Sequence, residues 1–302
     1  MSEEIVKSDT TVNENKTVKV NQETHVKQTN SILNAFKSEF STSVIPIYIN
    51  SLKRTVNFRE VTVAEQKTLS KTMIQNENRK DIVYDTQCAL INKVCLEEGF
   101  DIYKLTEFDR IRILMEIYAT NFFQNDIEFK CPECGTVNKY KIDFDKVSAK
   151  LNEFVLDDKT YKMEDRVRYY NFTINYPQVY NVSNFYKNYM KQYKNVTKKE
   201  QEVLDNLGNI EYINLFIKNV ELIKKDDTTN KMNADLTMMS YNEIEELLSV
   251  FPQNIVFDDD HGVLKYITTE FIDQINKVFQ YEKCAQCGHQ TNQGMGDLID
   301  FF

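Results

Sequence analysis

Two short cysteine motifs, far apart in the chain, constrain its fold more than any other feature. Residues 131–135 read CPECG and residues 284–288 read CAQCG, so each motif has the pattern C-x-x-C-G. One such motif places two thiolates on a tight turn, and two turns that face each other form a tetrahedral four-sulfur cage for zinc. Because Cys284 lies 150 residues after Cys134, a shared metal would join two distant segments.

The predicted metal is structural. We predict one Zn²⁺ per chain, bound by Cys131, Cys134, Cys284 and Cys287. Four thiolates close the coordination shell and leave no position for an activated water. A glycine follows the second cysteine of each motif, where a positive φ is easily adopted. Two independent redox-active pairs, or turns that bind no metal, are the alternative interpretations.

The other cysteines and the histidines are interpreted as structural or solvated groups. Cys88 and Cys95 fall on the apolar stripe of a predicted helix, so we expect them in the core. His289 follows the second motif and could replace a ligand, but we interpret it as a spare group beside the site. The sequence has no G-x-x-x-x-G-K or G-x-G-x-x-G motif and no recognisable nucleophile–base pair. We therefore do not expect an enzyme.

Composition argues against several classes of protein. The chain has 302 residues and a formal net charge of −9, so its overall field repels nucleic acid, although local basic patches are possible. No apolar run approaches the roughly 18 residues of a membrane-spanning helix, and the N-terminus lacks the apolar core of a signal peptide. The six cysteines, as metal ligands and core residues, suit a reducing compartment.

The first part of the chain is predicted to be an arm followed by helices. Residues 1–30 contain no Phe, Leu or Tyr and are interpreted as a mobile arm, because they cannot bury enough apolar surface to offset ordering entropy. Residues 31–126 are predicted to form a mainly helical domain. Within it, Thr62 and Glu65 form a capping box that starts a helix at Val63. A second helix carries Cys88 and is expected to end at Gly99.

The remainder is predicted to be a zinc ribbon split by a long insertion. Residues 127–145 form the first zinc-ribbon hairpin, with alternation of Tyr140, Ile142 and Phe144 in its second strand. Residues 146–280 are an inserted α+β segment, with a helical stretch from Thr197 to Ile223. Residues 281–302 hold the second knuckle and a C-terminal tail. The predicted fold class is α+β, helix-dominated, with a split four-cysteine zinc ribbon joining two halves.

The last six residues of the sequence are strongly apolar for a chain end. They read DLIDFF and follow the glycine-containing stretch QGMG. One interpretation is that the tail folds back onto the core of its own chain. The other is that it is a flexible peptide that docks in a groove of a partner. The candidate partner-binding residues are Leu298, Ile299, Phe301 and Phe302.

One stretch of the sequence resembles a known family. Residues 56–71, VNFREVTVAEQKTLSK, combine a short strand ending in Phe-Arg-Glu with a helix opening Thr-x-x-Glu-Gln. This pattern resembles the opening of the base plate protein family of T4-like tailed phages, which contributes baseplate hub subunits. The ending Asp-x-x-Asp-Phe-Phe is also similar to that family. The resemblance covers about residues 31–145 and, more weakly, the final residues.

The resemblance implies a structural subunit or assembly factor of the baseplate hub. Such a protein would be non-enzymatic, would contact other baseplate proteins, and would reside in the virion tail after assembly in the host cytoplasm. Neither a membrane nor a small-molecule substrate is expected. The alternative is a zinc-ribbon protein that binds nucleic acid or acts as a transcription accessory, against which the −9 charge counts.

Overall fold

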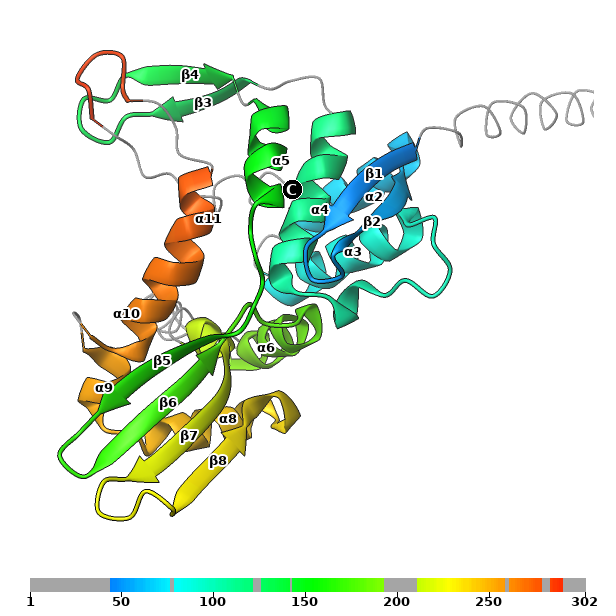
Figure 1. Ribbon diagram of the computed structural model, residues 1–302. Helices are drawn as coiled ribbons and strands as arrows, with labels where there is room; N and C mark the ends of the chain where they lie inside the picture. The colour runs from blue at the N-terminus through cyan, green and yellow to red at the C-terminus, as the bar shows by residue number, and fades with distance from the viewer. Residues whose placement is uncertain are drawn as a thin grey trace, which may run out of the picture. The chain divides into compact units, whose positions relative to one another are not determined.

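The computed structural model describes residues 44–76, 79–121, 126–141, 143–192, 211–258, 261–278 and 283–289. These residues form helices and three separate β-sheets, which confirms the α+β class (Figure 1). Two sheets have two strands each, and the third has four. The described residues from Ile45 onward belong to one compact unit. The arm expected at residues 1–30 lies outside the described residues.

A β-hairpin and a capped helix open the described chain. Strand β1 (Val44–Ile49) pairs with β2 (Arg54–Arg59), and the alternate residues Ile45, Ile47 and Ile49 are buried because they share one face. Helix α2 (Val63–Gln75) starts where the capping box predicted. The Glu65 N–H donates to the Thr62 hydroxyl oxygen at 3.3 Å, and the Thr62 N–H donates to the Glu65 carboxylate at 3.0 Å.

Two longer helices follow. They are α3 (Lys80–Val94) and α4 (Glu107–Asn121), separated by the 3₁₀ turn η1 (Ile102–Lys104). The expectation that α3 ends at Gly99 was wrong. Cys95 is already extended and bridges to Phe58, because the chain turns there to pair with the edge of β2. Gly99 instead supplies a positive φ of 76° in the following turn.

The first cysteine motif connects β3 (Asp126–Lys130) to β4 (Val137–Lys141), which pair antiparallel as expected for a hairpin. The predicted strand does not extend to Phe144. Helix α5 (Phe144–Asn152) begins there, because the Asp143 side chain accepts a hydrogen bond from the Lys146 N–H at 3.0 Å and so caps a helix.

The four-stranded sheet is an antiparallel meander in the order β5-β6-β7-β8. Its strands are β5 (Lys159–Glu164), β6 (Arg168–Ile174), β7 (Ile217–Lys224) and β8 (Lys231–Asp235). The helix predicted to reach Ile223 is therefore wrong at its C-terminal end. Val220 lies in β7 between Phe172 and Ala234, so cross-strand packing outweighs the helical spacing. The start of that stretch, at Thr197, lies outside the described residues.

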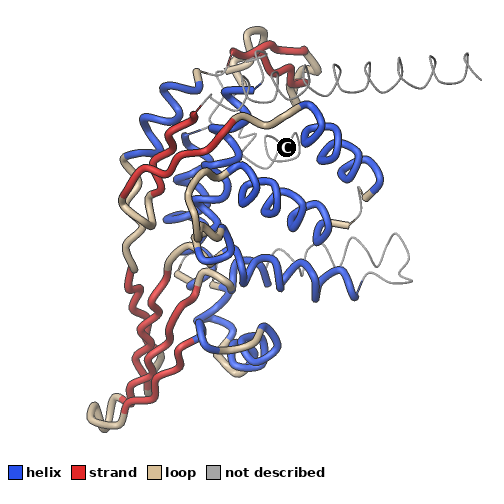
Figure 2. The backbone as a smooth tube through the Cα atoms, turned by 90° about the vertical axis from the view of Figure 1, so that its right-hand side faces the viewer, coloured by secondary structure: helices blue, strands red, loops and turns tan. Residues whose placement is uncertain are grey.

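Helices cover one face of this sheet. Figure 2 shows them on one side of the four strands. They are α8 (Tyr241–Ser249), α9 (Gln253–Phe257), α10 (Val263–Ile267) and α11 (Asp273–Val278), with the 3₁₀ turn η2 (Leu236–Met238) before α8 and the π-helical turn η3 (Thr268–Ile272) before α11. A second capping box, between Ser240 and Glu243, opens α8.

Helix α4 is shared by two hydrophobic cores. Its residues Phe108 and Met115 pack into the core between the sheet and helices α8–α11, and Ile113 packs into a second core. That second core contains β1, β2, α3 and helix α6 (Val179–Gln192), which follows β6 in the chain. Helix α6 comes from the segment between the cysteine motifs, so this segment contributes to the core of the preceding helices.

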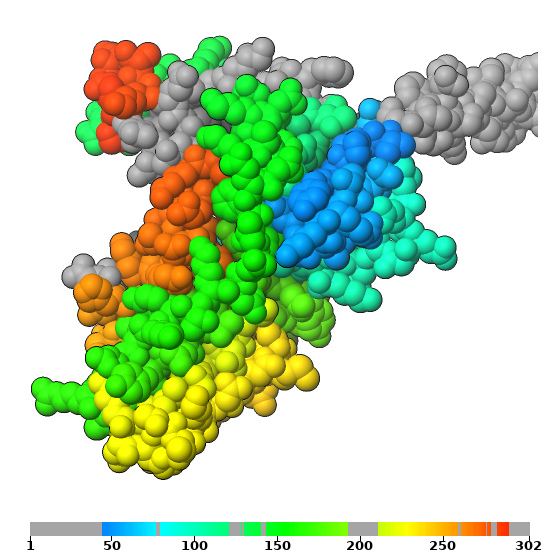
Figure 3. All heavy atoms as spheres, viewed as in Figure 1, coloured from blue at the N-terminus to red at the C-terminus, as the bar shows by residue number. Residues whose placement is uncertain are grey.

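Polar side chains connect the first hairpin to α5. The Asn50 amide donates to the carbonyl oxygens of Leu151 at 3.0 Å and Phe154 at 2.8 Å. Buried Arg112 of α4 donates to the side chains of Asn50 and Asn152. Figure 3 shows the resulting neighbours, with the blue hairpin beside the green α5. These bonds satisfy buried polar groups and fix α5 against α4.

Candidate metal centre

The two cysteine motifs form turns with the same backbone hydrogen bonds. In each, the N–H of the first cysteine donates to the carbonyl five residues later at 2.8 Å, and the glycine N–H donates back to the first cysteine at 2.9 Å. Gly135 and Gly288 adopt φ values of 73° and 72°, as the predicted tight turns require. The local sequence thus produces two nearly identical thiol-bearing turns.

The structure brings these two turns together. The Sγ atoms of Cys131, Cys134, Cys284 and Cys287 all lie within 4.8 Å of one another. Across the two motifs, Cys131 Sγ is 3.6 Å from Cys287 Sγ, and Cys134 Sγ is 3.6 Å from Cys284 Sγ. A tetrahedron of zinc–sulfur bonds of about 2.3 Å has sulfur–sulfur edges of about 3.8 Å, whereas a disulfide bond measures about 2.05 Å. The cluster therefore has the dimensions of a metal site and not of a disulfide.

Each motif contributes one buried and one exposed cysteine. Cys131 and Cys284 are buried, and Cys134 and Cys287 are exposed. The site thus lies at the surface, with half of its ligand atoms shielded. Figure 1 shows its position, with the red segment 283–289 beside the turn that joins β3 and β4. Among the described residues, no other cluster of His, Cys, Asp and Glu side chains has the geometry to hold a metal.

Asn138 is a site residue that the sequence analysis missed. It lies on β4, is only 7% exposed, and donates from its side-chain amide to Cys284 Sγ at 3.5 Å. Its side-chain oxygen accepts the Ala285 N–H at 3.1 Å. A second cross-link joins the side chains of Thr136 and Gln286, and the Thr136 hydroxyl lies 3.3 Å from Cys134 Sγ. These contacts hold the second motif against the first hairpin.

The thiols of the cluster have unequal proton affinities. Backbone hydrogen bonding from Cys287 lowers the pKa of Cys284 to about 6. Hydrogen bonding from Thr136 lowers the pKa of Cys134. A backbone hydrogen bond from His289 acts to lower the pKa of Cys287, but burial and the neighbouring sulfur atoms raise it to about 12. Four thiols this close therefore share protons, and a bound cation would replace them.

None of the other sequence candidates among the described residues belongs to the four-sulfur cluster. Cys88 is fully buried on α3, and burial raises the pKa of its thiol to about 12, so it behaves as a core residue. Cys95 is half-buried, and its Sγ lies 3.8 Å from the Asn57 carbonyl oxygen. His289 closes the second turn through its main-chain oxygen. Leu298, Ile299, Phe301 and Phe302 lie outside the described residues.

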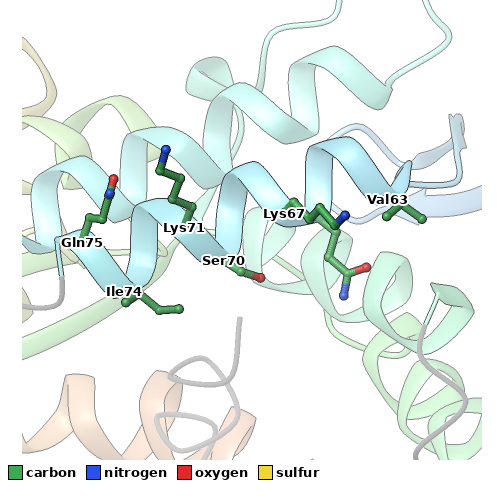
Figure 4. Close-up of a pocket in the computed structure, with 7 residues that line it drawn as sticks. Val63, Lys67, Ser70, Lys71, Ile74 and Gln75 are labelled. Atoms are coloured by element: carbon green, nitrogen blue, oxygen red, sulfur yellow. The ribbon is translucent and has the colours of Figure 1, made fainter.

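Two surface hollows among the described residues are further candidate sites. One, of about 560 Å³, runs along the exposed side of α2 and is shown in Figure 4, where Val63, Lys67 and Ile74 are among the labelled side chains. The other, of about 600 Å³, lies between α5 and the helices η3 and α11.

Together these features define a helix-rich α+β protein in which two distant segments meet at a four-cysteine cluster. A family model described as T4 bacteriophage base plate protein matches residues 42–302, and the chain belongs to this family. The resemblance seen at residues 56–71 is thereby confirmed, and the family gives the chain a structural role in the phage tail baseplate. No curated protein and no solved structure shows a significant match. In the part of the chain that the structure describes, no helix is long and apolar enough to cross a membrane.

Proposed function

We propose that this chain is a non-enzymatic subunit or assembly factor of the baseplate hub, and that one Zn²⁺ ion clasps its two cysteine motifs together. Membership of the baseplate family supports the role in the tail. The observation that carries the zinc is the cluster of four sulfur atoms within 4.8 Å of one another. The chain assembles with other baseplate proteins in the host cytoplasm and remains with them in the virion tail.

The residues fit zinc in number and in chemistry. Four thiolates complete a tetrahedral shell, so no position is left for a reacting water and the ion's role is structural. When bound, the ion supplies folding free energy, because the unfolded chain has no preformed site. It joins the β3–β4 hairpin to the turn at residues 283–289, and so closes the chain between the two motifs into a loop.

Metal content tests the shared site directly. Elemental analysis of the purified chain should give close to one zinc per chain, and Cys284→Ser should release the metal. Cys95→Ser is the matched control, because Cys95 is a free cysteine outside the cluster, and it should retain the zinc. Two zinc ions per chain, or undiminished zinc in Cys284→Ser, would contradict the shared site.

Two further measurements test the role in the tail. Mass spectrometry of purified virions should detect the chain among the baseplate proteins, and its absence would leave only a transient role in assembly. The family match gives no support to the nucleic-acid-binding alternative. A fluorescence-anisotropy titration with DNA and RNA at low salt should show no saturable binding, whereas tight binding would favour that alternative.

A further inference from the structure

The cleft between α5 and α11 has an apolar floor. Its floor is formed by Tyr176 and Phe271, whose ring centroids lie 5.1 Å apart, and by half-buried Phe154. Tyr176 and Phe271 belong to the main core, so the floor is fixed by packing from below. A volume of about 600 Å³ is within the range of clefts that bind small molecules and peptide side chains. Figure 3 shows the two walls side by side, in green and orange.

The rim of this cleft has a small excess of positive charge, with three lysines and two glutamates, although the chain as a whole carries a net charge of −9. Lys150, Lys159 and Lys277 line it, together with Glu153 and Glu270. Lys159 is neutralised by Glu270, at 2.9 Å. No ion pair with a described residue engages Lys150 or Lys277. Glu153 is the other rim carboxylate, so Lys150 and Lys277 outnumber it. An apolar floor with this residual positive charge is complementary to a segment that combines apolar and acidic side chains.

The chain itself contains such a segment. Residues 297–302 read DLIDFF, with two aspartates and four large apolar side chains. Phenylalanine side chains could cover Phe154 and Phe271, because removing apolar surface from water is favourable. The two aspartates are three residues apart and could pair with lysines on opposite walls.

Chain length places this segment within reach of the cleft. Val278, in the wall of the cleft, is five residues before Lys283, a stretch that spans at most about 18 Å. The turn at residues 284–289 brings the chain back beside its starting point, because the Cys284 N–H donates to the His289 carbonyl oxygen at 2.8 Å. From His289 to Asp297 there are eight residues, which span up to about 28 Å. The tail is therefore long enough to fold back to α11.

We propose that the cleft between α5 and α11 is a peptide-binding groove whose occupant is the segment 297–302 of the same chain. The aspartates lie against Lys150 and Lys277, and the phenylalanines lie on the aromatic floor. A short tether raises the effective concentration to the millimolar range, which favours the chain's own segment over a second copy. The hollow on α2 also has two lysines, Lys67 and Lys71, but Glu65 is the only buried residue of that helix, so it offers no aromatic floor.

Photo-crosslinking in the full-length chain tests this assignment. Phe301 is replaced by the photo-crosslinking residue benzoylphenylalanine. After irradiation, crosslinked peptides are identified by mass spectrometry. The expected products join residue 301 to peptides that contain residues 150–159 or 270–278. A mixture of isotopically heavy and light chains should give crosslinks within one chain. Crosslinks to α2, crosslinks between chains, or no specific crosslink would each overturn the proposal.

Charge reversal provides the matched variants. Lys150→Glu with Lys277→Glu should reduce the crosslink at least tenfold, whereas Lys67→Glu with Lys71→Glu on α2 should leave it unchanged. Lys150, Lys277, Lys67 and Lys71 are all exposed, so both variants should retain the parental melting curve. Adding Asp297→Lys and Asp300→Lys to the first variant should restore the crosslink. Equal yields from the two lysine variants would overturn the proposed groove.

Discussion

Asn138 shows how one side chain can hold two distant segments of this protein in register. Its amide nitrogen reaches Cys284 Sγ, and its amide oxygen accepts the N–H of the next residue, Ala285. The asparagine therefore contacts both a sulfur atom and the backbone of the opposite motif. Groups that orient metal ligands in this way set the affinity of a site as well as its geometry.

Replacing this asparagine should weaken the metal site without removing a ligand. We expect Asn138→Ala to lower zinc affinity by roughly 10- to 100-fold, the usual effect of losing a group that orients a metal ligand. Competition with a chromophoric chelator measures the change. Asn233→Ala, on the exposed edge strand β8, is the control and should bind zinc like the parent. An unchanged affinity in Asn138→Ala would mean that the cysteine turns alone orient the sulfur atoms.

The sequence predicts the four cysteines of the cluster but not their neighbours. Residue type and spacing identify Cys131 and its three counterparts, because few chemistries need two C-x-x-C-G turns. The role of Asn138 depends on the register of β4, where it lies opposite Phe129, and on where the second motif docks. The strand register and the docking of the second motif are both set by tertiary structure, and no local pattern around residue 138 encodes them.

At the scale of single elements, α2 is unusual because its one buried residue is a carboxylate. The Arg59 guanidinium donates two hydrogen bonds to Glu65, at 2.8 and 2.9 Å, and Lys93 lies 3.0 Å away. Hydrogen bonding from Arg59 holds the pKa of Glu65 far below its usual value, against the opposing effect of burial. Helix α2 is thus tied to β2 and α3 by charge at its first turn.

Removing this charge should destabilise the protein in a pH-dependent way. We expect Glu65→Gln to cost about 1–2 kcal/mol of unfolding free energy at pH 7, from the lost cap and charged hydrogen bonds. Because the folded pKa is depressed, the stabilisation is complete above the unfolded pKa of about 4.3 and is lost as pH falls through the folded pKa. The difference between parent and variant, measured by urea unfolding, should therefore shrink below about pH 4.

The control for this experiment is Glu98→Gln, which alters an exposed carboxylate. It should leave stability within about 0.5 kcal/mol of the parent at every pH. A difference between parent and Glu65→Gln that stays constant from pH 7 to pH 3 would show that the ionised carboxylate is not the source of the stabilisation.

Elements marked by a local chemical signal were the predictable ones. The capping box at Thr62 located the start of α2, because a cap satisfies its hydrogen bonds within four residues. The Ser240–Glu243 box at the start of α8 has the same local character. The helix predicted to start at Thr197 includes Val220, which lies in strand β7. Its neighbours Phe172 and Ala234 come from other strands, so the deciding contacts are not local.

At the scale of the whole molecule, the first described strand, β1, already contributes buried side chains to a hydrophobic core. Among the described residues, Ile45, Ile47 and Ile49 are the earliest members of the second hydrophobic core. The sequence did not predict that α4 contributes to both hydrophobic cores or that α6 packs against α3. Both arrangements depend on chain segments that are far apart in sequence. The α+β class itself followed from local periodicity.

Deleting residues 1–30 should leave folding intact. This stretch lacks the large apolar side chains that would add to a core, so the thermal midpoint should stay within about 2 °C of the parent. A deletion through Ile49 is the contrast, because it removes β1 and three buried isoleucines, and it should unfold at a much lower temperature. A large drop from the shorter deletion would place the arm within the folded body.

The separation of the two cysteine motifs also sets an order of events during synthesis. The second pair is made 150 residues after the first, which takes roughly 8–30 s at typical translation rates. Until then, the first pair can offer an ion only two sulfur atoms. A four-sulfur site can close only on a chain translated through Cys287. If the cluster binds zinc as proposed, metal capture would therefore distinguish chains that include both motifs from interrupted ones before any of them meets a neighbouring subunit.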